Sequence, residues 1–158
     1  MSRYHTLGEI PHKRHITFNN PKGGYYQEEL FGTAGFAGMS SLIYHLYPPT
    51  VVSEVKRLGD VSPKIAIDKN MKALSFKGFS LPTEKDYLDS RKILFANNDL
   101  HIGLAAPMSF NKDYFYRNSD ADEMLFIHIG SGKLRTMYGN IDFKYGDYLL
   151  IPRGIIYK

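Results

Sequence analysis

The 158-residue sequence predicts a mainly β protein built from antiparallel strands. Its last third, Tyr114–Lys158, consists of short runs of alternating apolar and polar residues that glycines and asparagines interrupt. No helical repeat separates these runs, so the pattern favours a β-meander over units in which a helix connects parallel strands. Residues 51–158 are therefore expected to form the β domain, and residues 1–50 an irregular arm with short strands.

Composition excludes several classes of function. Cysteine is absent, which removes disulfides, thiolate nucleophiles and zinc-thiolate sites. The net charge of +4 comes from scattered Lys and Arg, so no nucleic-acid partner is expected. The dense basic run His12–His15 is interpreted as a solvated surface or subunit contact, with an anionic partner as the alternative. No apolar run approaches the roughly 20 residues of a membrane span, and Met1–Phe18 has no secretory signal, so a cytoplasmic location is expected.

Turn residues mark the predicted elements of the arm. Asn20–Gly23 has the chemistry of a tight turn, because Pro21 sets its own φ and glycine tolerates a positive one. Short strands are expected on either side of it, at Ile16–Phe18 and Tyr25–Leu30. Small residues around Phe36 predict a loop before a strand at Ser41–Tyr47, which Pro48 ends.

The middle of the chain predicts more strands and one helical turn. Strands are expected at Lys64–Ile67 and Met71–Phe79, with a hairpin turn at Asp68–Asn70. Thr83 has capping character before a short helix or turn at Asp86–Lys92. A second hairpin is expected from two apolar runs and the turn between them, Ile93–Ala96, Leu100–Ala105 and Asn97–Asp99.

The last third supplies the predicted barrel strands. A buried strand is expected at Met124–Ile129, and a turn at Gly139–Asn140 separates the strands that follow. Glu123 is followed after six residues by Gly130, and Gly146 is followed after five by Pro152 and then by Gly154. This spacing resembles the paired motifs of cupins. The resemblance implies a cupin-like antiparallel β-barrel of the jelly-roll type.

The metal ligands of those motifs are not present. The three motif histidines fall on Tyr116, Asn118 and Tyr157, which leaves Glu123 as the one expected ligand. Two phenols and an amide are poor substitutes for imidazole at a transition metal. The chain is therefore predicted to contain no metal, catalytic or cofactor-binding residues. Glu123 is expected to pair with Arg117 or with a tyrosine of the barrel wall, and both motif tyrosines are expected to fill the core.

The histidines do not suggest a ligand set either. His101 is expected at a rim or in packing, and His128 is expected to be packed or hydrogen-bonded. Neither has a second ligand nearby at motif spacing.

A more specific resemblance covers nearly the whole chain. The stretches YHTLGEIPHKRHITF and EELFGTAGFAGMSSLIYHLYPPT, with YRNSDADE and GDYLLIPRG, resemble the N-terminal half of a bacterial homogentisate 1,2-dioxygenase. The resemblance implies a two-cupin Fe(II) enzyme that opens the ring of homogentisate in tyrosine and phenylalanine breakdown. It also implies that the iron ligands belong to the C-terminal half, that this chain alone is inactive, and that the enzyme forms trimers or hexamers. Because the last residues run into an expected next strand, an incomplete, truncated barrel is predicted.

The alternative hypothesis is a non-enzymatic, metal-free cupin module that binds a small ligand or joins subunits. Aromatic residues of the predicted wall would stack against such a ligand. They are Tyr114, Phe115, Tyr116, Phe126, Tyr148 and Tyr157. Packing of the core explains the same residues without a ligand. A sugar isomerase or another cupin oxygenase shares the barrel but not the segment Leu30–Thr50.

Overall fold

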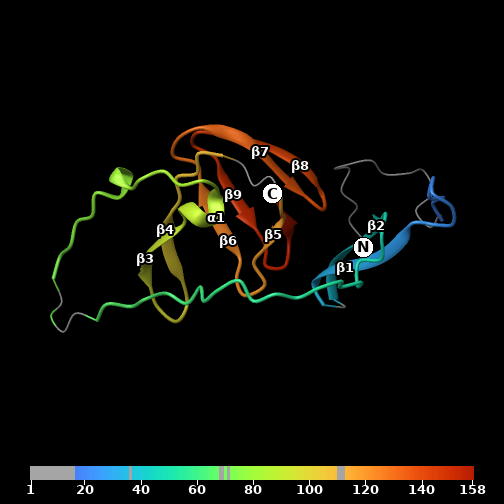
Figure 1. Cartoon of the computed structure of the whole chain (residues 1–158), viewed down its shortest axis with the longest axis horizontal. Coiled ribbons are helices and arrows are strands. Elements are labelled where there is room, and N and C mark those ends of the chain that lie inside the picture. The colour runs from blue at the N-terminus through green and yellow to red at the C-terminus, as the bar shows by residue number, and fades with distance from the viewer. Residues whose placement is uncertain (1–16, 36, 68–69, 71, 110–112) are drawn as a thin grey trace. The chain divides into compact units, whose positions relative to one another are not determined.

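The computed structural model describes residues 17–35, 37–67, 70, 72–109 and 113–158 (Figure 1). Predictions for His12–His15, for Ile16 and for most of the turn at Asp68–Asn70 lie outside these residues. The chain divides into two compact units, Met1–Asp60 and Val61–Lys158. Each unit is described separately, and the boundary expected after residue 50 stays a prediction.

The first unit contains one regular hairpin. Strand β1, Gln27–Ala34, pairs antiparallel with β2, Ala37–His45, so that Gln27 lies opposite His45. The expected loop around Phe36 is shorter than predicted, because its small residues join the two strands and β2 begins before Ser41. The turn at Asn20–Gly23 is confirmed, since the Gly23 N–H donates to the Asn20 carbonyl at 2.9 Å.

No helix or strand forms among the described residues between 51 and 77, and only a 3-10 turn follows at Gly78–Ser80. The predicted strands at Lys64–Ile67 and Met71–Phe79 are therefore wrong. Alternating apolar and polar residues form a strand only where a neighbouring strand supplies backbone hydrogen bonds. No described strand pairs with this segment. Its apolar side chains are exposed, as at Ile67 with 87%.

The predicted helical turn and second hairpin are both present. Helix α1 spans Tyr87–Ser90, and its cap is Asp86 rather than Thr83, because the Asp86 carboxylate accepts the Asp89 N–H at 3.0 Å. Strands β3, Lys92–Ala96, and β4, His101–Leu104, pair antiparallel. The turn between them is closed by the Asn97 side chain, which accepts two backbone N–H groups.

The remaining six strands form three nested pairs. They are β5 (Tyr116–Arg117), β6 (Glu123–Phe126), β7 (Ser131–Thr136), β8 (Gly139–Lys144), β9 (Tyr148–Ile151) and β10 (Ile156–Tyr157). Strand β7 pairs with β8, β6 with β9 and β5 with β10, all antiparallel. The expected meander is wrong, because in a meander each strand pairs with the next along the chain.

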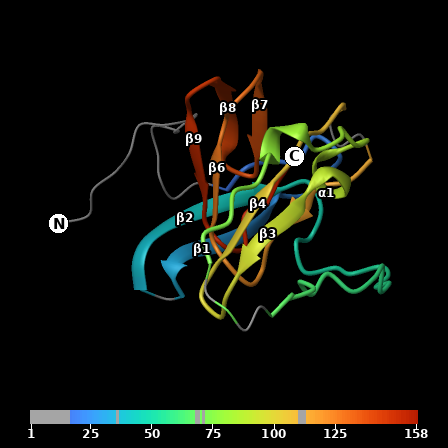
Figure 2. The same cartoon turned by 90° about the vertical axis from the view of Figure 1, so that its left-hand side faces the viewer.

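The nested pairs follow one another along a single folded ribbon (Figures 1 and 2). Thr136 lies opposite Gly139, Leu125 opposite Leu149 and Tyr116 opposite Tyr157, so the partners stay almost equally far from the ribbon's tip. The tip is a turn at residues 137 and 138, which corrects the turn expected at Gly139–Asn140. Gly139 and Asn140 instead belong to β8, where they pair with Thr136 and Arg135 of β7.

The ribbon folds back on itself where β10 also pairs with β7. Arg135 and Lys158 exchange two backbone hydrogen bonds of 2.8 Å, giving the strand order β5-β10-β7-β8. The predicted mainly β, cupin-like fold is therefore confirmed, although the sheets of the described residues do not close into a barrel.

The core of the second unit is small and lies inside the ribbon. Its buried apolar residues are Leu134, Leu149, Ile151, Ile155 and Tyr157. The buried strand expected at Met124–Ile129 is wrong, because β6 ends at Phe126, and Met124 and Ile129 are mostly exposed. Only one face of β6 packs on the core. No helix of the described residues has the length and apolar character to cross a membrane.

Candidate functional site

Three of the four positions that hold metal ligands in cupin motifs meet in the ribbon. Tyr116 of β5 lies opposite Tyr157 of β10, with ring centroids 5.4 Å apart and planes at 89°. The Tyr157 hydroxyl donates to Oε2 of Glu123 at 2.6 Å. Glu123 is 8% exposed and Tyr157 is 3% exposed. The nested pairing therefore places one carboxylate and two phenols together beside the core.

Asn118, the fourth position, does not join them. Its side-chain oxygen accepts the backbone N–H groups of Asp120 and Ala121 at 3.0 and 3.1 Å. An Asx turn of this kind fixes the connection between β5 and β6. The asparagine side chain thus shapes the loop through hydrogen bonds to its own segment.

Arg91 completes the cluster from outside the ribbon. Its Nη1 donates to the Tyr116 hydroxyl at 3.1 Å and lies 3.2 Å from Oε1 of Glu123. The guanidinium also lies over the rings of Tyr87 and Tyr116, at 5.4 and 5.6 Å from their centroids. We call Tyr87, Arg91, Tyr116, Glu123 and Tyr157 the arginine–tyrosine cluster.

Helix α1 positions two members of the cluster. Tyr87 opens the helix and Arg91 is its C-cap, so their i, i+4 spacing puts both side chains on one face. Asp86, the N-cap, also accepts the Tyr114 hydroxyl at 2.6 Å, which ties α1 to the segment leading into β5. The pKa of Asp86 is lowered by the Asp89 N–H and then by Tyr114. Burial and the nearby Asp86 raise the pKa of Tyr114.

The surroundings of two phenols of the cluster, Tyr157 and Tyr87, favour their protonated form. Burial, then Tyr87 and the bond to Glu123, raise the pKa of Tyr157 far above the usual range. Burial likewise raises the pKa of Tyr87. For Arg91, burial disfavours the charged form, but the surrounding phenols and Glu123 outweigh it and raise the pKa. The cluster therefore presents one O–H donor, that of Tyr157, and one guanidinium to Glu123.

These groups do not fit a divalent transition metal. A guanidinium has no lone pair to offer, and a phenol that keeps its proton is a weak ligand. Within the part of the chain that the structure describes, no three His, Cys, Asp or Glu side chains are grouped as a metal site. The cluster therefore suits the neutralisation of a buried carboxylate better than the binding of iron.

Of the two alternatives predicted for Glu123, Arg117 or a tyrosine, the tyrosine is confirmed, because Tyr157 binds it. An arginine also pairs with Glu123, but it is Arg91 and not Arg117. Arg117 follows Tyr116 in β5, and adjacent residues of a strand face opposite ways, so Arg117 is exposed. The signal that points to Arg91 is the helical spacing of Tyr87 and Arg91, together with the need of a buried carboxylate for a cation.

The two singled-out histidines lie apart from the cluster's polar contacts. His128 stacks on the ring of Phe79, with centroids 4.2 Å apart and planes at 19°, but both side chains are exposed, so this stacking lies at the surface. His101 begins β4 opposite Ala96, and its side chain is exposed. Ring stacking at His128 and strand pairing at His101 are not the contacts of a metal ligand.

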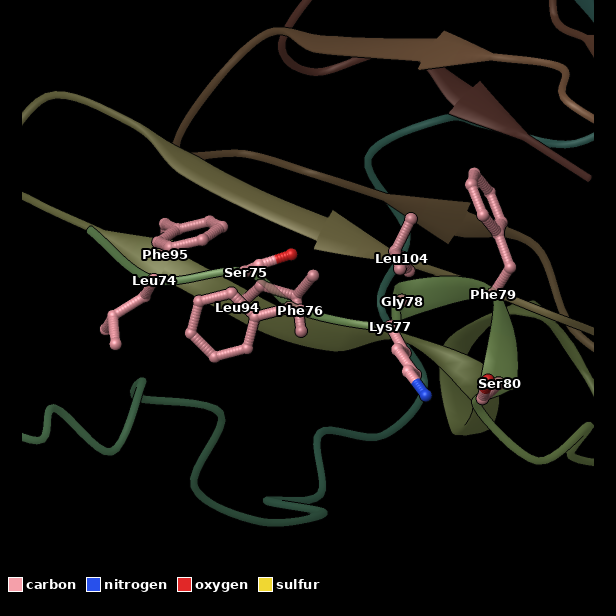
Figure 3. Close-up of a pocket in the computed structure, with 10 residues that line it drawn as sticks. All are labelled: Leu74, Ser75, Phe76, Lys77, Gly78, Phe79, Ser80, Leu94, Phe95 and Leu104. Carbon is pink, nitrogen blue, oxygen red and sulfur yellow. The ribbon is translucent and has the colours of Figure 1, made fainter.

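A separate open hollow of about 630 Å³ lies beside the β3–β4 hairpin (Figure 3). Its lining is largely apolar. The rings of Phe76 and Phe95 meet edge to face, with their centroids 5.3 Å apart. Figure 3 shows these rings near Leu74 and Leu94, while Phe79 stands at the other end of the row. None of the six aromatic residues predicted to form a ligand-binding wall lines this hollow.

Comparison with known proteins finds a similarity that extends over nearly the whole chain. The chain is 36% identical over 159 aligned residues to a protein of Saccharolobus solfataricus named "Putative dioxygenase SSO1533". The alignment covers 98% of this chain but only 40% of that protein, so the chain spans well under half of its relative's length. No family model matches the chain, and no solved structure matches it. The chain is thus similar, over nearly all its residues, to part of a protein named as a dioxygenase.

Proposed function

We propose that the chain is the N-terminal, metal-free cupin portion of a ring-cleaving dioxygenase that opens homogentisate with O₂ in tyrosine and phenylalanine breakdown. The observation that carries this proposal is the alignment of 98% of the chain with a protein named as a dioxygenase. The substrate rests on the resemblance of the segment Leu30–Thr50 to homogentisate enzymes.

In this proposal the iron is held by residues beyond this chain, because the arginine–tyrosine cluster does not fit it. Ferrous iron, when bound, would bring the phenol substrate and O₂ together. The chain contributes the scaffold, and by itself it has no turnover. We further propose a homo-oligomer, a trimer or hexamer, which would cover some of the exposed apolar side chains, such as Leu30 and Met39.

The test is oxygen uptake by the full-length product with and without added ferrous ion. Homogentisate should be consumed with O₂ only when iron is present, and the 158-residue chain assayed alongside should neither consume O₂ nor retain iron after desalting. Gentisate and catechol serve as comparison substrates. Uptake with one of these but not with homogentisate would overturn the substrate and keep the reaction class. Absence of uptake with all three from an iron-loaded enzyme would overturn both.

A second candidate function is the binding of a small apolar ligand without catalysis, which the hollow beside Phe76 and Phe95 favours. Titration of the chain with a hydroxylated phenylacetate should then shift the NMR signals of residues 74–80. Phe76→Ala should abolish these shifts, whereas Phe115→Ala, a change at an exposed ring outside the hollow, should preserve them. Unchanged spectra at millimolar ligand would rule this candidate out.

A further inference from the structure

Glu123 is the least expected residue of the ribbon's interior. Its side chain is 8% exposed, and a carboxylate so buried is stable only when its charge is matched. Both of its oxygens are occupied, Oε1 by the Arg91 guanidinium at 3.2 Å and Oε2 by the Tyr157 hydroxyl at 2.6 Å. The carboxylate thus has one cation and one neutral donor, and neither belongs to its own strand.

We infer that the Arg91 guanidinium is a built-in replacement for a metal ion: it supplies the positive charge that Glu123 requires and closes this position to divalent cations. This inference concerns the cluster itself and does not depend on the reaction proposed above.

The position of Arg91 supports this exclusion. A dication bound to Glu123 would lie within a few ångströms of the guanidinium, and two cations so close in a half-buried site repel strongly. The guanidinium cannot easily withdraw, because it is hydrogen-bonded to Tyr116 and held over the rings of Tyr87 and Tyr116. It also remains charged, whereas a lysine or histidine in its place would lose a proton more readily.

The first experiment reverses the replacement. Tyr116→His and Tyr157→His are introduced together, once with Arg91 retained and once with Arg91→Ala. Both chains, checked for folding by circular dichroism, are titrated with Co²⁺, whose visible absorption reports coordination. The variant that lacks Arg91 should bind Co²⁺ at least about tenfold more tightly than the variant that keeps it. Adding Glu123→Gln should abolish this gain.

Equal affinity in the two backgrounds would overturn the exclusion by Arg91, and so would a gain that survives Glu123→Gln. Arg117→Ala in the two-histidine background is the matched control. Arg117 is the exposed neighbour of Tyr116 in β5, and its removal lowers the net charge equally without touching Glu123. It should leave Co²⁺ affinity unchanged.

A stability cycle tests the charge replacement without any histidine and covers the case in which those variants fail to fold. Arg91→Met should lower the folding equilibrium constant about a hundredfold or more, because it leaves Glu123 buried without a cation. Arg91→Met with Glu123→Gln should recover at least tenfold of this loss. Additive losses, or a loss from Arg117→Met as large as that from Arg91→Met, would show that Arg91 does not neutralise Glu123.

Discussion

The ribbon of β5 to β10 and the segment of residues 51–77 both carry alternating apolar residues, but only the ribbon forms strands. In the ribbon, every run has a partner at nearly the same distance from the tip, as with Leu125 opposite Leu149. Residues 51–77 have no such partner among the described residues, and Leu58 is 99% exposed. Alternation therefore predicts a strand only where a turn of suitable length returns a second strand in register.

The largest effect is expected when a leucine is replaced by alanine in each of the two regions. Leu149→Ala should lower the free energy of unfolding by about 2–5 kcal/mol, because Leu149 is buried in the ribbon and a cavity replaces its side chain. Leu58→Ala should change it by less than about 0.5 kcal/mol. Urea denaturation followed by circular dichroism measures both. Similar losses at the two positions would show that residues 51–77 are packed as tightly as the ribbon.

The second test concerns the hydroxyl of Tyr157. Tyr157→Phe should cost about 1–3 kcal/mol at pH 7, because the buried Glu123 loses its donor at Oε2. Tyr145→Phe, which removes a hydroxyl from a side chain that is 67% exposed, is the control and should be nearly neutral. A cost at Tyr145 equal to that at Tyr157 would contradict the cluster.

The same substitution should change the dependence of stability on pH. The pKa of Tyr157 is raised on folding, so above about pH 10 the unfolded chain loses a proton that the folded chain keeps. The contribution of Tyr157 is thus complete below pH 10 and declines as the pH rises above it. Urea midpoints between pH 8 and 11.5 should fall less steeply for Tyr157→Phe than for the unchanged chain. Parallel profiles would mean that Tyr157 is not protected from titration.

The smallest test compares two glycines. Gly154 follows Pro152 in the turn before β10 with a φ of 85°, a conformation that costs an alanine roughly 1–2 kcal/mol. Gly59 has no positive φ, and no described heavy atom lies within 4 Å of the place that a Cβ would take, so Gly59→Ala should be neutral or stabilise by about 0.4–1 kcal/mol. Thermal unfolding distinguishes the two. A loss at Gly59 as large as at Gly154 would indicate a defined turn at residue 59.

Local chemistry accounts for the elements that were predicted correctly. The β3–β4 hairpin is set by Asn97, whose side chain closes the turn through groups two and three residues away. Helix α1 begins directly after Asp86, whose side chain caps it. The predicted helical turn starts at Asp86, within one residue of the observed start, although Thr83 was expected to have the capping character. Such features depend on residues that are close in the chain, so they can be predicted from a single sequence.

The pairing of the ribbon could be predicted only in part. Motif spacing identified Tyr116, Glu123 and Tyr157 as related positions, and the structure brings them together. It did not indicate that β6 pairs with β9 rather than with β7. That choice depends on which pairing buries Leu134, Leu149 and Ile151 in a common core, which no local pattern contains.

The amino-acid sequence alone thus determined the strand-rich character of the chain, its short hairpins and the absence of imidazole at the motif positions, because these depend on composition and on nearby residues. Tertiary structure alone decided that residues 51–77 form no strand and that Arg91, 32 positions before Glu123, is its cation. The physical reason is that hydrogen-bond partners and countercharges are supplied by segments distant in sequence, and folding selects them by what must be buried together.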